Sequence, residues 1–204
     1  MRSITTILIV MLGLFVAACT EDEENSLELG GFDEERLIEQ RQAKDKDFAE
    51  SDESPIPEHV RSSFTGLRYY KPDETFAVEA SFEGFSKQDT ITMETSTNEP
   101  RFAVRVGRFT FDIKGRTHQL VAYRFVGSDD QELFVPFKDK TSGDETYGGG
   151  RYLDLHLEDD TSYAIDFNQA YNPYCAYNSN YSCPLVPDEN KLTVAITAGE
   201  RTWK

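Results

Sequence analysis

Apolar and polar residues alternate along several stretches of the chain after Gly66, and this pattern constrains the fold more than any other feature. The first stretch has its apolar positions at Phe76, Val78, Ala80 and Phe82. The same period of two recurs at 91–95, 102–106, 109–113, 152–157 and 192–197. A period of two places one face of a strand in the core and leaves the other in water, which antiparallel sheets allow and all-parallel sheets do not. We therefore expect a mainly β domain built on antiparallel strands.

Turn-forming residues separate these stretches, at 98–100, 114–115, 127–130 and 159–160. Short strands divided by regular turns are typical of a β-sandwich or a barrel. The sequence shows no alternation of strands with helices and no internal repeat. We predict an antiparallel β-sandwich or a barrel-like domain, and the pattern does not distinguish the two.

The segment 32–50 is rich in helix-forming residues and contains neither glycine nor proline. Leu37, Ile38 and Phe48 form only a weak apolar stripe, which predicts a surface helix that docks one edge on the rest of the protein. The prolines at 55 and 57 follow it and end the helical pattern. A helix followed by strands of this length predicts a single domain over 32–204.

Residues 1–18 have the pattern of an export signal. Arg2 is followed by an apolar run and then by Val16-Ala17-Ala18-Cys19. The run is short for a membrane span of ~20 residues. Small residues before a cysteine resemble the lipobox of bacterial lipoproteins, so we predict that Cys19 is the lipid-anchored first residue of the mature protein. An ordinary secretory signal that is cut before a cysteine is the alternative.

The segment 19–31 is acidic and ends in paired glycines, which predicts a tether between the lipid and the domain. Acidic residues directly behind Cys19 resemble surface-export tags of some lipoproteins, and Thr20 is not the aspartate of an inner-membrane retention tag. We therefore predict a lipid-anchored protein of the bacterial cell envelope, in the outer membrane. The sequence leaves the leaflet open.

The chain has 37 acidic and 21 basic residues and a formal net charge of −16. Nucleic acid binding requires clustered basic residues that neutralise phosphates, and the sequence has no run of lysine and arginine. We expect no nucleic acid partner. The membrane contact is predicted to be the covalent lipid rather than charge attraction.

The segment 134–152 is rich in glycine and ends near Arg151. Glycine lets a backbone turn sharply or approach a ligand closely. Such a loop can cradle an anion, with the guanidinium making a bidentate contact, or it can be a long connection with glycine turns. An internal carboxylate, Asp166 or Asp139, is a further partner for the guanidinium, and we expect a buried pair with Asp166.

The segment 166–190 has an unusual content of tyrosine, asparagine, proline and cysteine. Tyrosines offer flat faces with polar tips, and asparagine amides bind irregular backbone or a ligand. A segment of this length without regular secondary structure is functional or is pinned in place. Its side chains suited to these roles are Asn168, Tyr171, Asn172, Tyr174, Tyr177, Asn178, Asn180 and Tyr181.

Three cysteines are present, and lipidation of Cys19 leaves Cys175 and Cys183 as a pair. In an oxidising compartment such a pair usually forms a disulfide, which would contribute roughly 2.5 kcal/mol on a chain-entropy estimate. We predict this disulfide. The scattered histidines make a poor metal pattern, so we expect no metal, and Cys175 acting as a nucleophile with His156 stays a lesser alternative.

These two segments also carry a resemblance to a known family. The runs FVPFKDKTSGDETYGGGRYLDL, DFNQAYNPYCAYN and SCPLVP resemble the bacterial family catalogued as domain of unknown function 1684, over roughly residues 35–202. The resemblance implies no activity, substrate or cofactor, and we expect no cofactor. The family motif corresponds here to Asp139, Thr146, Tyr147, Gly150, Arg151, Tyr152, Asp166, Asn168, Tyr171, Asn172, Cys175, Tyr177 and Cys183.

Two functions fit this polar and aromatic motif, and a structural role without any ligand is the third alternative. The first is a binding module for a small molecule, a sugar or a peptide, and its candidate ligand-binding residues are Asp139, Tyr147, Arg151, Tyr152, Asp166, Asn168, Tyr171, Asn172 and Tyr177. The second is a hydrolase that uses Asp139, Asp166 and Glu145 as paired carboxylates, or Cys175 as its nucleophile, in the same site. The sequence contains no GxSxG or HExxH motif, which makes the binding module the stronger hypothesis.

Overall fold

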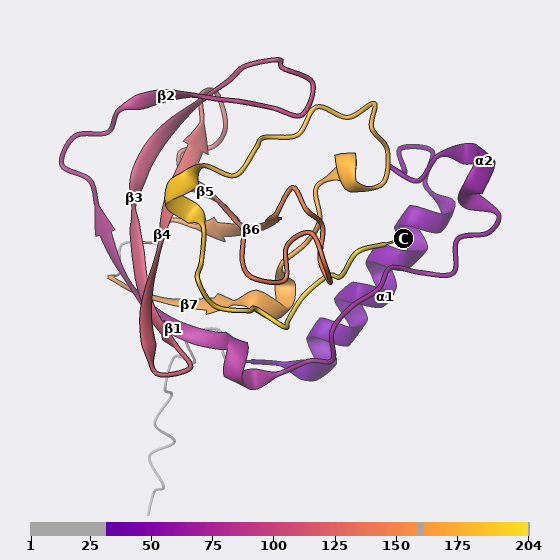
Figure 1. The fold of residues 1–204 in the computed structure, drawn as a ribbon, viewed down its shortest axis with the longest axis horizontal. Coiled ribbons are helices and arrows are strands. Elements are labelled where there is room, and N and C mark those ends of the chain that lie inside the picture. The colour runs from indigo at the N-terminus through magenta and orange to yellow at the C-terminus, as the bar shows by residue number, and fades with distance from the viewer. Residues whose placement is uncertain (1–31, 159–160, 204) are drawn as a thin grey trace, which may run out of the picture.

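The computed structural model describes residues 32–158 and 161–203 (Figure 1). The export signal, Cys19 and the acidic tether predicted within 1–31 lie outside the described residues, as does the turn predicted at 159–160.

The predicted N-terminal helix is confirmed as α1, Glu34–Glu50. It begins where the Asp33 carboxylate accepts a hydrogen bond from the backbone N–H of Arg36 at 2.9 Å, which satisfies one of the free donors of the first turn. Leu37 and Phe48 are buried, whereas most of the helix surface is exposed. The helix therefore packs along a narrow stripe, as the sequence predicts.

The strands form one antiparallel sheet that curls into a half-barrel, so the domain is barrel-like and mainly β (Figure 1). The order of the strands is β6-β5-β4-β3-β1-β7, and β2 pairs with β3 outside this path. The strands are β1 (Ala77–Gly84), β2 (Thr90–Met93), β3 (Arg101–Ile113), β4 (Arg116–Phe125), β5 (Glu132–Phe137), β6 (Arg151–His156) and β7 (Ser162–Asp166). The remaining elements are helix α2 (Glu58–Arg61) and the short 3-10 turns η1 (Glu74–Phe76), η2 (Phe167–Gln169), η3 (Tyr174–Ala176) and η4 (Asp188–Asn190).

The long strand β3 bends the sheet. Its pairing with β4 slips between Arg105 and Gly107, which is a β-bulge and increases local bend and twist. A Cβ at Gly107 would lie 2.5 Å from the ring of Phe82 and 2.6 Å from the backbone oxygen of Glu83. Glycine at this position lets the Phe82 ring pass directly over the bulged strand.

The main apolar core lies inside the curl and takes side chains from every strand except β2. Phe109 is fully buried there, with ring centroids 4.7 Å from Phe82 and 5.0 Å from Tyr163. The C-terminal segment crosses this core and adds Leu192, Ile196 and Ala198 (Figure 1).

The strand expected at 192–197 was wrong, because these residues are irregular. The alternation is real, since Leu192 and Ile196 are buried and Thr193 is exposed. The main-chain groups, however, bond individually to Lys138, Lys140 and buried side chains rather than to a neighbouring strand. Burial pattern and strand pairing are therefore separate properties of this segment.

A buried asparagine joins two strands that pair poorly. The partner register of β4 and β5 contains only Tyr123 opposite Phe134. The side chain of Asn190 is fully buried and exchanges hydrogen bonds of 2.8 and 2.9 Å with the backbone of Val121, and donates a third, at 2.7 Å, to the oxygen of Pro136. It replaces the missing ladder bonds between the two strands.

Within the described residues, the structure contains no helix with the length and apolarity needed to span a bilayer.

Two glycines offer a matched test of the packing before β6. Gly150 has φ +98°, and a Cβ there would lie 2.6 Å from the backbone oxygen of Phe137 and 2.6 Å from Val186. Gly127 has a similar φ of +94° but open space around it. We predict that Gly150→Ala lowers the free energy of unfolding by roughly 2–4 kcal/mol, because overpacking adds to backbone strain. Gly127→Ala should cost only about 1 kcal/mol, and equal losses in urea denaturation would contradict the packing argument.

Candidate functional site

Arg151 begins β6 and its side chain is completely buried. Its Nη1 donates to the backbone oxygens of Ala198 and of Glu200, the latter at 3.3 Å, and its Nη2 donates to that of Ile196 at 2.8 Å. Its guanidinium carbon lies 5.2 Å from the centre of the Phe137 ring. Burial lowers the pKa of Arg151 from its ordinary value, and the nearby Asp139 opposes this shift. The guanidinium thus holds the C-terminal segment and has no face open to a ligand.

The carboxylate beside this guanidinium belongs to Asp139. Asp139 Oδ1 lies 3.5 Å from Arg151 Nη2, and both side chains are fully buried. The carboxylate accepts hydrogen bonds from the Thr141 hydroxyl at 2.9 Å, the Ser142 hydroxyl at 3.1 Å and the backbone N–H of Ile196 at 2.7 Å. All these contacts are internal, so Asp139 is structural.

The expected partner of Arg151, Asp166, was wrong, although an internal buried pair does form. Asp166 ends β7, and β7 and β6 lie at opposite ends of the strand order. Its carboxylate instead accepts from the backbone N–H of Asn168 at 2.9 Å and from its Nδ2 at 2.7 Å. Asn168 then binds Asp73 twice, accepting from its N–H at 3.0 Å and donating to its backbone oxygen at 2.8 Å.

A second buried carboxylate, Glu200, joins three distant parts of the chain. Its Oε1 lies 2.6 Å from Lys44 Nζ on α1. Its Oε2 accepts from the backbone N–H of Asn172 at 2.8 Å and from the hydroxyl of Tyr177 at 2.5 Å. Burial is the main cause that raises the pKa of Tyr177, and the charge of Glu200 adds to it. Asn172 and Tyr177 are therefore ligands of a protein carboxylate and not of an external molecule.

The sequence reasoning missed Glu200, Lys44 and Arg41. Arg41 donates from α1 to the backbone oxygens of Tyr70 at 2.9 Å and Asn168 at 3.1 Å. Both basic residues looked like ordinary positions of a solvated helix. The one available signal was the run AGE near the C-terminus, which belongs to the sequence that resembles the family.

Two further tyrosines of the motif contact each other at β6. Tyr152 and Tyr171 form an isolated antiparallel bridge, with their ring centroids 5.8 Å apart. The Tyr152 hydroxyl donates to the backbone oxygen of Pro184, and the Tyr171 hydroxyl donates to Asp154 at 2.6 Å. These contacts cover β6 with the segment 171–184.

The disulfide predicted between Cys175 and Cys183 is not found, because both cysteines are free thiols. The two residues are nevertheless close, since the backbone N–H of Cys175 donates to Cys183 Sγ at 3.0 Å. A disulfide requires a particular relative orientation of the two side chains, and their separation in the sequence does not determine that orientation. Hydrogen bonds, and not a covalent link, hold the segment 166–190 in place.

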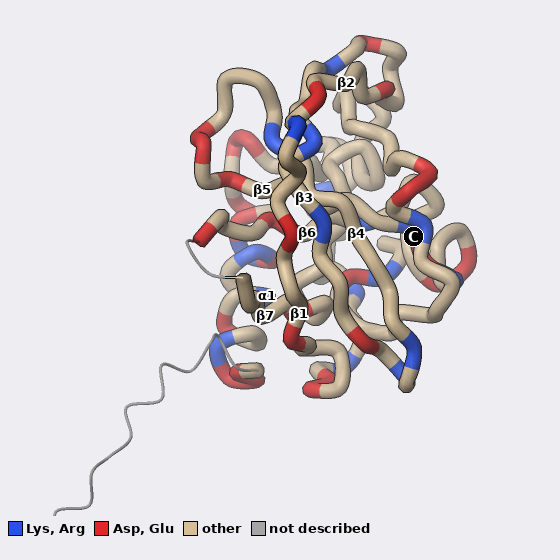
Figure 2. Tube along the Cα trace, turned by 90° about the vertical axis from the view of Figure 1, so that its left-hand side faces the viewer, with Lys and Arg blue, Asp and Glu red and all other residues tan. Residues whose placement is uncertain are grey.

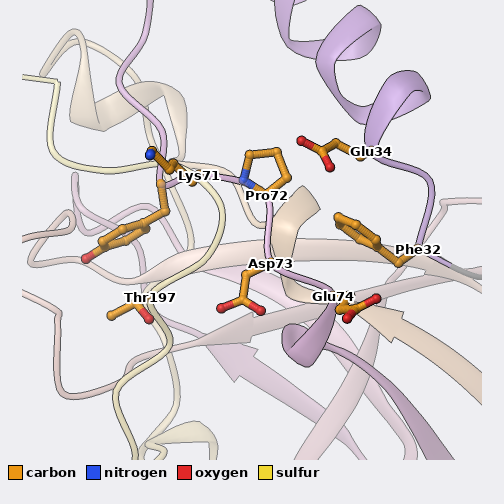
Figure 3. Close-up of a pocket in the computed structure, with 8 residues that line it drawn as sticks. Phe32, Glu34, Lys71, Pro72, Asp73, Glu74 and Thr197 are labelled. Atoms are coloured by element: carbon orange, nitrogen blue, oxygen red, sulfur yellow. The ribbon is translucent and has the colours of Figure 1, made fainter.

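The structure has an open pocket elsewhere, between the start of α1 and the segment 70–74 (Figure 3). Its volume is about 720 Å³. The start of α1 contributes Phe32 and Glu34 on one side, and the C-terminal segment contributes Thr197 on the other. The lining residues are Phe32, Glu34, Tyr70, Lys71, Pro72, Asp73, Glu74 and Thr197.

The buried polar residues hold the walls of this pocket. Asn168 binds the backbone of Asp73 on both sides. Tyr70 is held through its oxygen by Arg41 and through its N–H by the oxygen of Gly199, at 3.0 Å. Arg151 binds the backbone on either side of Thr197, at 196 and 198. The candidate residues Asn168 and Arg151 therefore support the pocket walls from the protein interior and do not line the pocket.

The chain belongs to the family described as Protein of unknown function (DUF1684), whose model matches residues 62–201. A similar solved structure is the solution NMR structure of an uncharacterized protein of Haloarcula marismortui, with 40% identity and a TM-score of 0.66. The similarity covers 83% of this chain and 94% of that one. No curated protein matches the chain. The predicted family is confirmed, and its description assigns no activity.

Arg151→Ala tests the structural role of the buried pair. We expect a loss of roughly 3–5 kcal/mol in the free energy of unfolding, because the substitution strands the Asp139 carboxylate away from water. The control Arg116→Ala, at an exposed position of β4, should change it by no more than about 0.5 kcal/mol. Urea denaturation followed by circular dichroism measures both. Equal stability of the two variants would show that Arg151 is not structural.

Proposed function

We propose that this chain is a lipid-anchored protein of the bacterial cell envelope whose domain binds a small molecule carrying a protonated amine. The sequence Val16-Ala17-Ala18-Cys19 after a short apolar run supports the anchor. The acidic segment behind Cys19 supports the outer membrane as the location. The ligand occupies the pocket between α1 and the segment 70–74.

The charge of the pocket lining favours a cation. Glu34, Asp73 and Glu74 contribute three carboxylates against the single amine of Lys71. Within the described part of the chain, the side chains of Glu34 and Glu74 make no hydrogen bond or ion pair to the protein, so both can meet a ligand. Aromatic rings attract cations through their faces, and Phe32 is one of the lining residues.

The observation that carries the proposal is the fixation of the pocket walls. The buried side chains of Arg151 and Asn168 and the partly buried side chain of Arg41 bind the backbone of the lining segments. A site fixed before binding loses little freedom when it takes up a ligand, which increases affinity. These wall contacts also account for the positions of the buried polar residues.

The hydrolase alternative lacks a free acid or base at the predicted carboxylates. Asp139 is fully buried and accepts hydrogen bonds at both of its oxygens, and Asp166 accepts hydrogen bonds from Asn168. Glu145 Oε2 lies 3.8 Å from Arg201 Nη2, in an ion pair. General acid–base catalysis requires a group within reach of the substrate proton. We therefore favour the binding module.

The charge distribution also supports the expectation that the protein does not bind nucleic acid. Figure 2 shows basic positions interspersed with acidic ones along the strands and loops that face the viewer. Phosphate backbones require a continuous basic surface.

A titration with spermidine tests the pocket. We expect changes in the backbone amide ¹⁵N chemical shifts of residues 70, 71, 73, 74 and 197, and binding that weakens with added salt. The double variant Glu34→Gln/Glu74→Gln should weaken binding roughly two- to thirtyfold, because each exposed ion pair contributes ~0.2–1 kcal/mol. Glu83→Gln, at an exposed position of β1 outside the pocket, is the matched control. Equal effects of the two variants, or equal binding of neutral glucose, would overturn the ligand class.

Cys19→Ala tests the anchor. We expect loss of palmitate labelling and a shift of the protein out of the membrane fraction, because the thioether to the lipid can no longer form. Labelling and fractionation in a bacterial host measure both. Unchanged membrane partition with unchanged labelling would refute the lipoprotein proposal.

A further inference from the structure

Cys175, Cys183 and Tyr147 form a thiol cluster that the binding pocket does not use. Cys175 lies in η3, and the hydroxyl of Tyr147 is 3.8 Å from its sulfur. The backbone N–H of Cys175 donates to Cys183 Sγ at 3.0 Å. Since this nitrogen is bonded to the Cα that carries the Cys175 thiol, the two cysteine side chains are direct neighbours in space, as exchange between them requires.

The two cysteines differ in their access to solvent. Cys175 is half-buried, whereas only 6% of Cys183 is exposed. Hydrogen bonds to the loop after β2 fix Cys183: its N–H donates to the Ser96 hydroxyl at 3.1 Å, and its oxygen accepts from the Ser96 N–H at 2.9 Å. Cys175 is therefore the more accessible residue of the pair, and Cys183 is held in a fixed position by its backbone hydrogen bonds.

The electrostatics of the pair have the same asymmetry. The thiol of Cys183 lowers the pKa of Cys175 to about 6, and the Tyr147 hydroxyl contributes to the same shift. The neighbouring Cys175 and burial raise the pKa of Cys183. These shifts favour the thiolate, which is the nucleophilic form, at Cys175 and the protonated thiol at Cys183.

We propose that Cys175 and Cys183 form a redox-active dithiol that exchanges reversibly with external disulfides, with Cys175 as the attacking sulfur and Cys183 as the resolving sulfur. This site is separate from the amine-binding pocket and does not depend on the proposed function.

The reaction has two exchange steps. The Cys175 thiolate attacks one sulfur of an external disulfide RS–SR, so that a mixed disulfide forms and one RS⁻ leaves. Cys183 then loses its proton and attacks Cys175 Sγ, which forms the Cys175–Cys183 bond and releases the second RS⁻. Two electrons pass from the two protein sulfurs to RS–SR. Cys183 supplies one proton and solvent water supplies the second, so that both RS⁻ end as RSH. Because the thiolate of Cys175 is stabilised, it is a good leaving group, and excess thiol reverses the reaction.

Oxidised glutathione is the probe for this exchange. The reduced full-length protein is mixed with it, quenched in acid and mapped by peptide mass spectrometry, which reads Cys19 separately. We expect an intramolecular disulfide in the unmodified protein that reduced glutathione reopens under native conditions. Cys183→Ser should accumulate glutathione on Cys175, and Cys175→Ser should leave Cys183 unmodified. Equal modification of the two variants, or a disulfide that opens only after unfolding, would overturn the proposal.

A second measurement needs no cysteine substitution. Between pH 9 and pH 6 the rate of Cys175 alkylation by iodoacetamide should fall about twofold, whereas that of an ordinary cysteine falls roughly 200-fold. Tyr147→Phe should move the midpoint of this profile upward, and Tyr174→Phe, beside Cys175 in the chain, should not. A midpoint at the ordinary cysteine value in the unmodified protein would refute the role of Cys175 as the attacking sulfur.

Discussion

The side chain of Arg151 holds a segment of the protein that has no strand to pair with. Residues 196–200 cross the core of the half-barrel, and the backbone oxygens of Ile196, Ala198 and Glu200 find their partner in the Arg151 side chain. Buried main-chain groups need hydrogen-bond partners, and a neighbouring strand is the usual source. The guanidinium supplies these bonds from one position at the start of β6. Its charge is balanced by Asp139, which in turn binds the N–H of Ile196.

Other buried polar side chains solve the same problem along the C-terminal part of the chain. Asn190 replaces ladder bonds between β4 and β5. Asn168 binds the backbone of Asp73. Glu200 binds the N–H of Asn172 and also draws in Lys44, so that α1 docks on the same segment. A hydrophobic contact tolerates sliding, whereas these bonds require one arrangement, and they thereby select a single packing of an irregular segment.

In this arrangement, the buried residues with the chemistry of a binding site are separate from the surfaces that a ligand or reagent can reach. Arg151, Asn168 and Asn172 have the chemistry of a binding site, but their side chains are buried and their hydrogen bonds go to other parts of the protein, mostly to the backbone. Their effect on the surface is indirect, because they fix the pocket next to α1 (Figure 3). The segment 171–184, which Tyr152 and Tyr171 help to hold on β6, presents the half-buried thiol of Cys175.

The sequence by itself determined the antiparallel sheet, the N-terminal helix and the family, because side-chain period, helix propensity and a distinctive motif are local properties. It also identified Arg151 as a residue with an internal carboxylate. Only the tertiary structure decided that this carboxylate is Asp139 and not Asp166, since the order of the strands separates β6 from β7. Likewise, 192–197 has the alternation of a strand but makes only individual backbone–backbone hydrogen bonds, to Lys138 and Lys140 beyond the end of β5, and Cys175 and Cys183 meet as thiols. Partners, cavities and the direction of a thiol depend on which distant segments meet in space, and no local pattern of residues contains that information.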